Sequence, residues 1–128
     1  MSPEFPTVGV LLESGRHDRA HYAFVVATGA AALGRRVVLF ATNQGCHALL
    51  TDWSGMQDPG RDARLRAAGV AGLDELRSAA RELGIRMIAC EAGLRSEHID
   101  PACLMSGVHV AGIATFLSEL GSGQIVTL

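Results

Sequence analysis

The chain has 128 residues, 48% of them hydrophobic and 19% charged, and its net charge is -2. This composition argues against a disordered chain and against a basic nucleic-acid surface, and the length fits one domain over residues 1–128. The longest apolar runs are too short to cross a bilayer, so we expect no membrane span.

All eleven basic residues are arginine. Without lysine, the chain cannot form a Schiff base with pyridoxal phosphate, and it cannot supply the lysine of a P-loop. Residues 1–6 are predicted to be a loose end without the charged and apolar regions of a secretory signal, so we expect a cytoplasmic protein. Three cysteines in that compartment do not indicate a disulfide framework.

Hydrophobic periodicity and glycine or proline breaks divide the chain into alternating strands and helices. In chain order we predict a strand over residues 7–12, a helix over 19–33, a strand over 37–40, a short helix over 46–50, a helix over 73–83, a strand over 87–90, a short helix over 96–104 interrupted near Pro101, a strand over 108–111, a helix over 112–120 and a last strand over 124–128. Residues 51–70 are the least regular part, which is typical of a lid, an interaction loop or disorder.

The first predicted helix has two notable features. Asp18 precedes it and is a plausible N-cap. The helix is apolar around almost its whole circumference, since Tyr22, Phe24 and Val26 cannot share one face. A helix with so little polar surface is covered by more than its own sheet, so we expect a subunit interface there.

Two joints in the chain share one design. Leu33-Gly34 and Leu83-Gly84 each end a predicted helix and lead, through a residue pair that ends in arginine, into an apolar strand. Repeated connections of this kind from helix to strand indicate an α/β fold with a parallel sheet.

Cys90 is the best candidate for chemistry. The run 87–89 is short and apolar and follows the helix stop at Gly84, which predicts a buried parallel strand that ends at Cys90. In open α/β sheets, ligands bind outside the carboxyl ends of the strands. Backbone N–H groups in the turn over residues 91–93 would favour a thiolate, and Arg95 or His98 can add positive charge, whereas the charge of Glu91 acts against it.

Other interpretations of Cys90 stay open. Most free cysteines are simply small buried hydrophobic residues. The phosphate-binding Cys-x5-Arg loop of cysteine phosphatases needs five residues between cysteine and arginine, and only four separate Cys90 from Arg95. Such a loop is too short to wrap a tetrahedral anion, so we set a phosphatase aside.

Metal binding also has weak support. The possible ligands are Cys46, His47, Cys90, His98, Cys103 and His109. No pair has a zinc-site spacing such as C-x2-C, and His109 alternates with valines in a strand, as a structural histidine does. We therefore predict no metal and no cofactor.

Several further residues are expected at the same sheet edge. His17 and His21 follow the first strand and are more often solvated or capping residues, although His21 can line the same cleft as Cys90. Asn43 and Gly45 follow the second strand. The complete predicted binding set is Ser14, His21, Asn43, Gly45, Glu91 and Gly93.

Three stretches of the chain resemble the DsrE/DsrF family of small sulfur-handling proteins, most closely its DsrE-like branch labelled "peroxiredoxin family". They are residues 72–91 with Ala89-Cys90-Glu91, residues 107–117 with Gly112-Ile113-Ala114-Thr115-Phe116-Leu117, and residues 38–45. The first strand and helix agree in pattern only. The chain has no peroxiredoxin thiol motif, so we expect no peroxidase activity.

The resemblance implies a three-layer α/β/α sandwich around a five-stranded parallel sheet, and a homo-oligomer or hetero-oligomer, commonly a trimer or hexamer. It also implies that Cys90 matches the cysteine that accepts sulfur as a persulfide in TusD-type sulfur-relay members. A donor or acceptor protein would then be the partner. Departures exist, because methionines often follow the cysteine in the family and residues 92–95 here contain none.

Two other functions remain as alternatives to a sulfur carrier or sulfurtransferase. One is a non-catalytic oligomeric binding or adaptor module with a small-ligand cleft at the sheet edge. The other is a metal-linked or redox-linked role for Cys46, Cys90 and Cys103.

Overall fold

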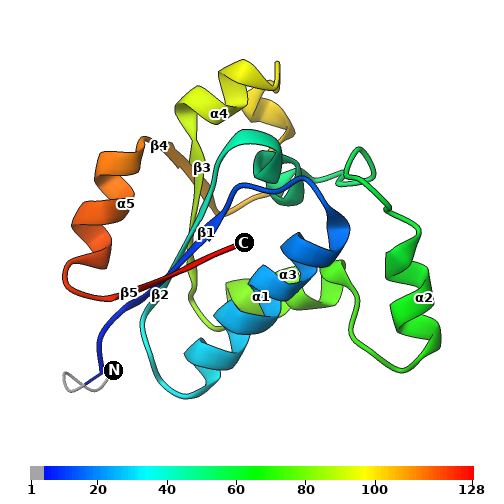
Figure 1. The fold of residues 1–128 in the computed structure, drawn as a ribbon, viewed down its shortest axis with the longest axis horizontal. Helices are drawn as coiled ribbons and strands as arrows, with labels where there is room; N and C mark the ends of the chain where they lie inside the picture. The colour runs from blue at the N-terminus through cyan, green and yellow to red at the C-terminus, as the bar shows by residue number, and fades with distance from the viewer. Residues whose placement is uncertain (1–4) are drawn as a thin grey trace.

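The computed structural model describes residues 5–128 (Figure 1). Phe5 and Pro6 lead into the first strand without regular secondary structure, as expected of a loose end. The rest of that prediction, for residues 1–4, lies outside the described residues.

Five parallel strands form one sheet in the order β4-β3-β2-β1-β5. They are β1 (Val8–Leu12), β2 (Val37–Ala41), β3 (Arg86–Cys90), β4 (Val108–Ala111) and β5 (Gln124–Thr127). The three inner strands are apolar on both faces, which is the pattern of a sheet covered on each side. The predicted parallel α/β sheet is confirmed.

Helices cover both faces of the sheet (Figure 1). They are α1 (His17–Ala32), the 3-10 helix η1 (Asn43–Leu49), α2 (Arg61–Ala67), α3 (Leu73–Glu82), α4 (Glu91–Ser96), the 3-10 helix η2 (Pro101–Cys103) and α5 (Ile113–Leu120). Helices α1 and α3 pack side by side on one face, and α5 covers the other. This arrangement is the predicted three-layer sandwich.

The two faces of the sheet bury different cores. Alternate residues of β2 point in opposite directions, so that Leu39 packs toward α1 while Phe40 packs toward α5. Phe40 stacks on Phe116 of α5 with ring centroids 5.2 Å apart. Cys90 belongs to this second, smaller core, and its side chain therefore points to the α5 side of the sheet.

Three local predictions are wrong. Asp18 is not the N-cap of α1, because the helix begins earlier, at His17, and the capping position is Arg16. Instead, Asp18 lies in the first turn and pairs with Arg16 at 2.7 Å. Residues 91–93 are not a free turn, since α4 begins directly after Cys90 and ends near the residue where a helix over 96–104 was expected. Only η2 remains of that helix, and Pro101 starts it.

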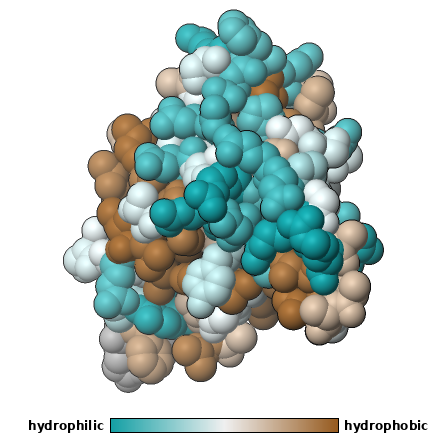
Figure 2. All heavy atoms as spheres, turned by 45° about the vertical axis from the view of Figure 1, so that its right-hand side comes forward, coloured by the Kyte–Doolittle hydropathy of each residue, from teal (hydrophilic) through white to brown (hydrophobic). Residues whose placement is uncertain are grey.

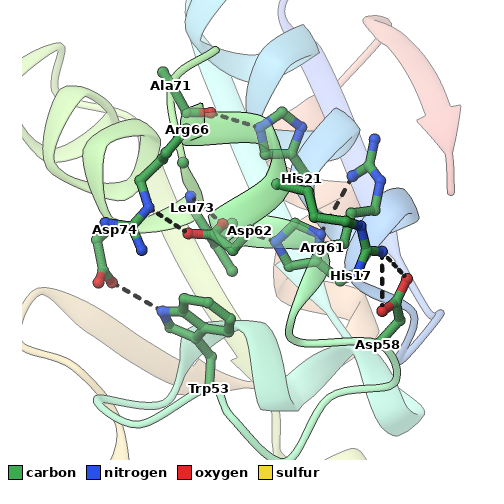
Figure 3. A network of polar contacts seen from close by, with 12 residues as sticks. His17, His21, Trp53, Asp58, Arg61, Asp62, Arg66, Ala71, Leu73 and Asp74 are labelled. Atoms are coloured by element: carbon green, nitrogen blue, oxygen red, sulfur yellow. Dashed lines mark hydrogen bonds and ion pairs between the residues drawn. The ribbon is translucent and has the colours of Figure 1, made fainter. Parts of the chain in front are cut away.

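Residues 51–70 are also more regular than predicted, because they contain α2. A buried polar network holds this segment against α1 (Figure 3). His17 is fully buried, and its Nε2 lies 2.8 Å from Asp62 Oδ1. Arg61 Nη1 lies 3.2 Å from His17 Nδ1. A guanidinium only donates, so Nδ1 accepts, and the ring proton lies on Nε2 and is donated to Asp62.

Asp62 links α2 to the start of α3. Its Oδ1 also accepts the backbone N–H of Leu73 at 2.8 Å, and Arg66 lies 3.5 Å from its Oδ2. One turn along α1 from His17, His21 Nε2 lies 2.8 Å from the carbonyl oxygen of Ala71. Helix α2 and the start of α3 are thus held against α1 by polar contacts between residues far apart in sequence.

The surface has an uneven distribution of apolar residues. Figure 2 shows hydrophilic residues across the centre of one face and hydrophobic residues gathered along one side of it. Tyr22 of α1 is more than half exposed, and Val110, Ile113 and Leu117 near α5 are also exposed. Among residues 5–128, no helix combines the length and apolar character needed to cross a bilayer.

Candidate functional site: the cavity at Cys90

Cys90 lies at the carboxyl end of β3, where it is the N-cap residue of α4. Its Sγ accepts a hydrogen bond from the backbone N–H of Gly93 at 3.4 Å. The residue is only 8% exposed, yet it lines a surface cavity of about 660 Å³. Cys90 therefore combines a packed position and an amide donor to its sulfur with a place in the wall of a surface cavity.

The cavity is built from two neighbouring strand ends. Cys90 is paired in register with Ala111, so the residues that follow β3 lie beside those that follow β4. The lining residues are Cys90, Glu91, Ala92, Arg95, Ser96, Gly112 and Ile113. Ala92, Ser96, Gly112 and Ile113 line the cavity but lie outside the predicted set. Gly112 and Ile113 have a signal in the strand order, because adjacent parallel strands bring their carboxyl ends to one edge.

The charge beside the sulfur is balanced. Arg95 was expected to add positive charge, and it does line the cavity, but it pairs with Glu91 at 2.9 Å. This pair is well exposed to solvent, so it contributes little free energy. His98 lies beyond the end of α4, is exposed and does not line the cavity. The Gly93 N–H is thus the group in direct contact with the thiol.

The predicted binding residues divide between different places. Glu91 lines the cavity at Cys90, and Gly93 donates to the sulfur. Asn43 lies close to Gly93, where α4 packs against η1, and does not line the cavity. His21 points to the opposite side of the sheet, where it bonds to Ala71, so the structure does not bring it to Cys90.

The remaining two members of that set have structural contacts. Ser14 accepts the backbone N–H of Arg16 through its Oγ at 3.1 Å. Gly45 is buried, and its N–H bonds to the carbonyl oxygen of Glu13 at 3.1 Å. Both lie where β1 and β2 end, but away from the cavity at Cys90.

The other cysteines differ sharply from Cys90. Cys46 is fully buried in η1, and its Sγ donates to the carbonyl oxygen of Ala41 at 3.5 Å. Burial, with a smaller contribution from the nearby Cys90, raises the pKa of the Cys46 thiol to about 12. Cys103 is exposed in η2. All three are free thiols, and no group of three or more metal-ligating side chains is present within residues 5–128.

The comparisons with known proteins agree with this architecture. The fold superposes on the YchN protein of E. coli with a TM-score of 0.74 at 12% identity, covering 97% of this chain and all of that one. It also matches MTH1491, a protein of unknown function from Methanobacterium thermoautotrophicum, with a TM-score of 0.65 at 16% identity over 96% of this chain and 99% of that one. No protein-family model matches the sequence.

Sequence relatives extend the comparison beyond the fold. The sulfur carrier protein DsrE2 of Allochromatium vinosum is 25% identical, covering 92% of this chain and 94% of that protein. This similarity in sequence and fold supports a DsrE/DsrF-like family for the chain. The chain is also 24% identical to the uncharacterized protein YrkE of Bacillus subtilis, over 98% of each. The relationship to DsrE2 supports a sulfur-related role at the level of the family.

Proposed function

We propose that this protein is a cytoplasmic sulfur carrier that holds sulfur as a persulfide on Cys90. The observation that carries the proposal is the position of Cys90, which lines a surface cavity while its Sγ accepts the N–H of Gly93. A backbone amide directed at sulfur stabilises negative charge on it, and the thiolate is the nucleophilic form of cysteine. The relationship to the DsrE2 sulfur carrier supports the choice of sulfur as cargo.

The chemistry needs two displacement steps. In loading, the Cys90 thiolate attacks the outer sulfur of a donor persulfide, R–S–SH. A sulfur–sulfur bond to Cys90 forms, the sulfur–sulfur bond of the donor breaks, and the donor leaves as its thiolate. In unloading, an acceptor thiolate attacks the outer sulfur of the Cys90 persulfide, and the Cys90 thiolate is the leaving group. Sulfur changes hands without any external oxidant or reductant.

The surroundings of the cavity suit a protein donor or acceptor. Ile113 and Ala92 give its lining an apolar side, and Val110 and Leu117 expose further apolar surface nearby. An exposed apolar patch is typical of a docking site for another polypeptide. The Glu91–Arg95 pair lies at the same place and offers both signs of charge to a partner.

The proposal includes a homo-oligomer, a trimer or hexamer. Supporting it, α1 carries apolar residues that the chain itself leaves partly uncovered, among them Tyr22, Val25 and Val26. Sedimentation velocity on the purified protein measures the assembly directly. A monomer at micromolar concentration would contradict this part of the proposal without touching the chemistry of Cys90.

Mass spectrometry tests the carrier function. The protein is incubated with a small persulfide donor, digested without reductant, and the cysteine peptides are weighed. We expect the Cys90 peptide to gain the mass of one sulfur atom and Cys90→Ser to show no gain there. Cys103→Ser is the matched control, since it removes an exposed thiol outside the cavity and should leave loading of Cys90 intact. A wild-type protein that takes up no sulfur at Cys90 would rule the proposal out.

One observation favours the second candidate, a non-catalytic binding module. Cys90 packs with Val38, Ile88 and Phe116 in the core on the α5 side, as an inert structural cysteine does. The two candidate functions predict different reactivities for the Cys90 thiol. Alkylation of Cys90 no faster than that of the exposed Cys103 would favour the binding module.

A further inference from the structure

A second cavity, of about 190 Å³, lies at the same edge of the sheet but on the other side of α4. Its lining residues follow three neighbouring strands and the long loop. They are Gly15 after β1, Gln44 and His47 after β2, Glu97 at the end of α4, and Gly55, Met56 and Gln57 in the loop. The carboxyl edge of a parallel sheet is the usual place for a ligand. The cavity shares no lining residue with the one at Cys90.

A carboxylate and an imidazole are paired in this cavity. His47 Nε2 lies 3.1 Å from Glu97 Oε1, and each side chain is 25% exposed. A carboxylate accepts, so the Nε2 proton is donated to Glu97 and the other ring nitrogen, Nδ1, is left as an acceptor in the neutral ring. Nδ1 faces the loop, since a Cβ on Gly55 would lie 3.8 Å from it.

Three hydrogen-bond acceptors remain available among the lining side chains. Gln57 Nε2 donates to Gln44 Oε1 at 3.2 Å, which leaves Gln57 Oε1 unused by that bond. In the described part of the chain, Gln57 Oε1, Glu97 Oε2 and His47 Nδ1 make no side-chain hydrogen bond. No arginine lines the cavity, so its one full charge is the carboxylate of Glu97 when His47 is neutral.

We propose that this cavity binds the ammonium group of a small primary amine. A primary ammonium has three N–H donors and one positive charge, which match the three acceptors, one of which belongs to the Glu97 carboxylate. An oxyanion is disfavoured, because the site has a carboxylate and no arginine. The chain contains no lysine, so the side chains of a second copy cannot supply the ammonium group.

NMR titration of the nitrogen-15-labelled protein with ethylammonium chloride at constant ionic strength tests this proposal. We expect saturable shifts of the Gly55 and Gln57 signals with ethylammonium. Tetramethylammonium, which has the charge but no N–H, and acetate should produce none. Shifts that do not saturate, or equal shifts with acetate, would overturn the proposal. A lysine side chain presented on a short acetylated peptide is a further probe, and tighter binding than ethylammonium would identify a protein as the source of the amine.

Three variants sharpen the result. Glu97→Gln keeps the shape and removes the charge, so the affinity for ethylammonium should fall about tenfold or more. Gly55→Leu places a side chain toward His47 and should abolish binding, while Gly60→Leu in the same loop is the matched control and should bind normally. Unchanged binding by Gly55→Leu would overturn the site. Cys90→Ser should bind ethylammonium like the wild type, so that the test of amine binding does not depend on whether Cys90 carries sulfur.

Discussion

The Sγ of Cys46 and the backbone of Gly93 lie so close together that a Cβ on Gly93 would approach the sulfur to 3.0 Å. The same Cβ would lie 2.8 Å from the backbone nitrogen of Asn43. Gly93 is thus the point where α4 packs onto η1 without an intervening side chain. Because Gly93 also donates its N–H to Cys90, this contact fixes the position of the donor.

Gly93→Ala should destabilise the protein, since α4 must move away from η1 to make room for the added methyl group. We expect a loss of about 1–3 kcal/mol in the free energy of unfolding, measured by urea denaturation. Gly29→Ala is the matched control, because Gly29 is exposed in the last turn of α1 and a Cβ there meets nothing within 4 Å. That variant should gain about 0.5–1 kcal/mol. Equal effects of the two substitutions would contradict the role of Gly93.

Cys103 and Cys46 should differ sharply in their reaction with iodoacetamide. Cys103 is exposed and should be modified in the native protein, whereas Cys46 is buried, with a pKa raised to about 12, and should react only after unfolding. Peptide mapping by mass spectrometry at increasing urea concentration follows all three sites at once. Modification of Cys46 at the same rate as Cys103 in native conditions would show that η1 is open.

The cavity at Cys90 should discriminate between reagents by size. Gly112 lines it, and a Cβ there meets nothing within 4 Å, so a larger side chain extends into open space. We expect Gly112→Leu to slow modification of Cys90 by a bulky fluorescent maleimide several-fold more than modification by iodoacetamide. Gly112→Ala controls for the loss of glycine at the N-cap of α5 and should behave like the wild type. The two rates follow from peptide mapping after timed quenching.

Acid should destabilise the fold through Asp62. Burial acts to raise the pKa of this carboxyl, but the hydrogen bond from Leu73, the contact with His17 and the charge of Arg66 outweigh it and hold the pKa below its usual value. A lowered pKa means that the carboxylate stabilises the fold above its unfolded pKa of about 3.9, and that this stabilisation is lost as the pH falls through the lower folded value.

Asp62→Asn should therefore flatten the dependence of stability on pH below about pH 4. At neutral pH it should cost about 2 kcal/mol, because hydrogen bonds to a charged acceptor become bonds to a neutral one. Thermal melts from neutral to acidic pH measure both effects. Arg64→Gln is a suitable control, since its pair with Asp58 is exposed and contributes little. A parallel fall of wild type and Asp62→Asn in acid would contradict the assignment.

The sequence predicts those elements whose position is set by neighbouring residues, and it does not predict those held by contacts between distant residues. Strand β2 is apolar throughout, β3 is apolar after Arg86, and both follow glycine helix stops, so their position and the strand-end location of Cys90 could be predicted. Helix α2 could not, because it is short and polar and is held by the contact between Asp62 and His17, which lie 45 residues apart. For the same reason, the sequence suggests a solvated or capping His17, whereas the structure buries this side chain and bonds it to Asp62.

The same reason separates the correct from the incorrect site residues. Glu91 and Gly93 follow Cys90 directly, so their proximity to it is a property of the chain itself. His21 was grouped with Cys90 because it follows β1, but the face on which α1 packs decides where its side chain points. The pair of His47 and Glu97 spans 50 residues and has no signal in the local sequence.

Helix α4 separates the two cavities, with Cys90 at its start and Glu97 at its end. Because the helix has only six residues, a change in its orientation at one cavity also reaches the residues that line the other. Thermodynamic linkage then makes any communication between the cavities symmetrical: an amine that changes the equilibrium of sulfur loading by some factor has its own affinity changed by that factor when sulfur is loaded. A carrier built in this way would register its cargo at a distance from the sulfur itself.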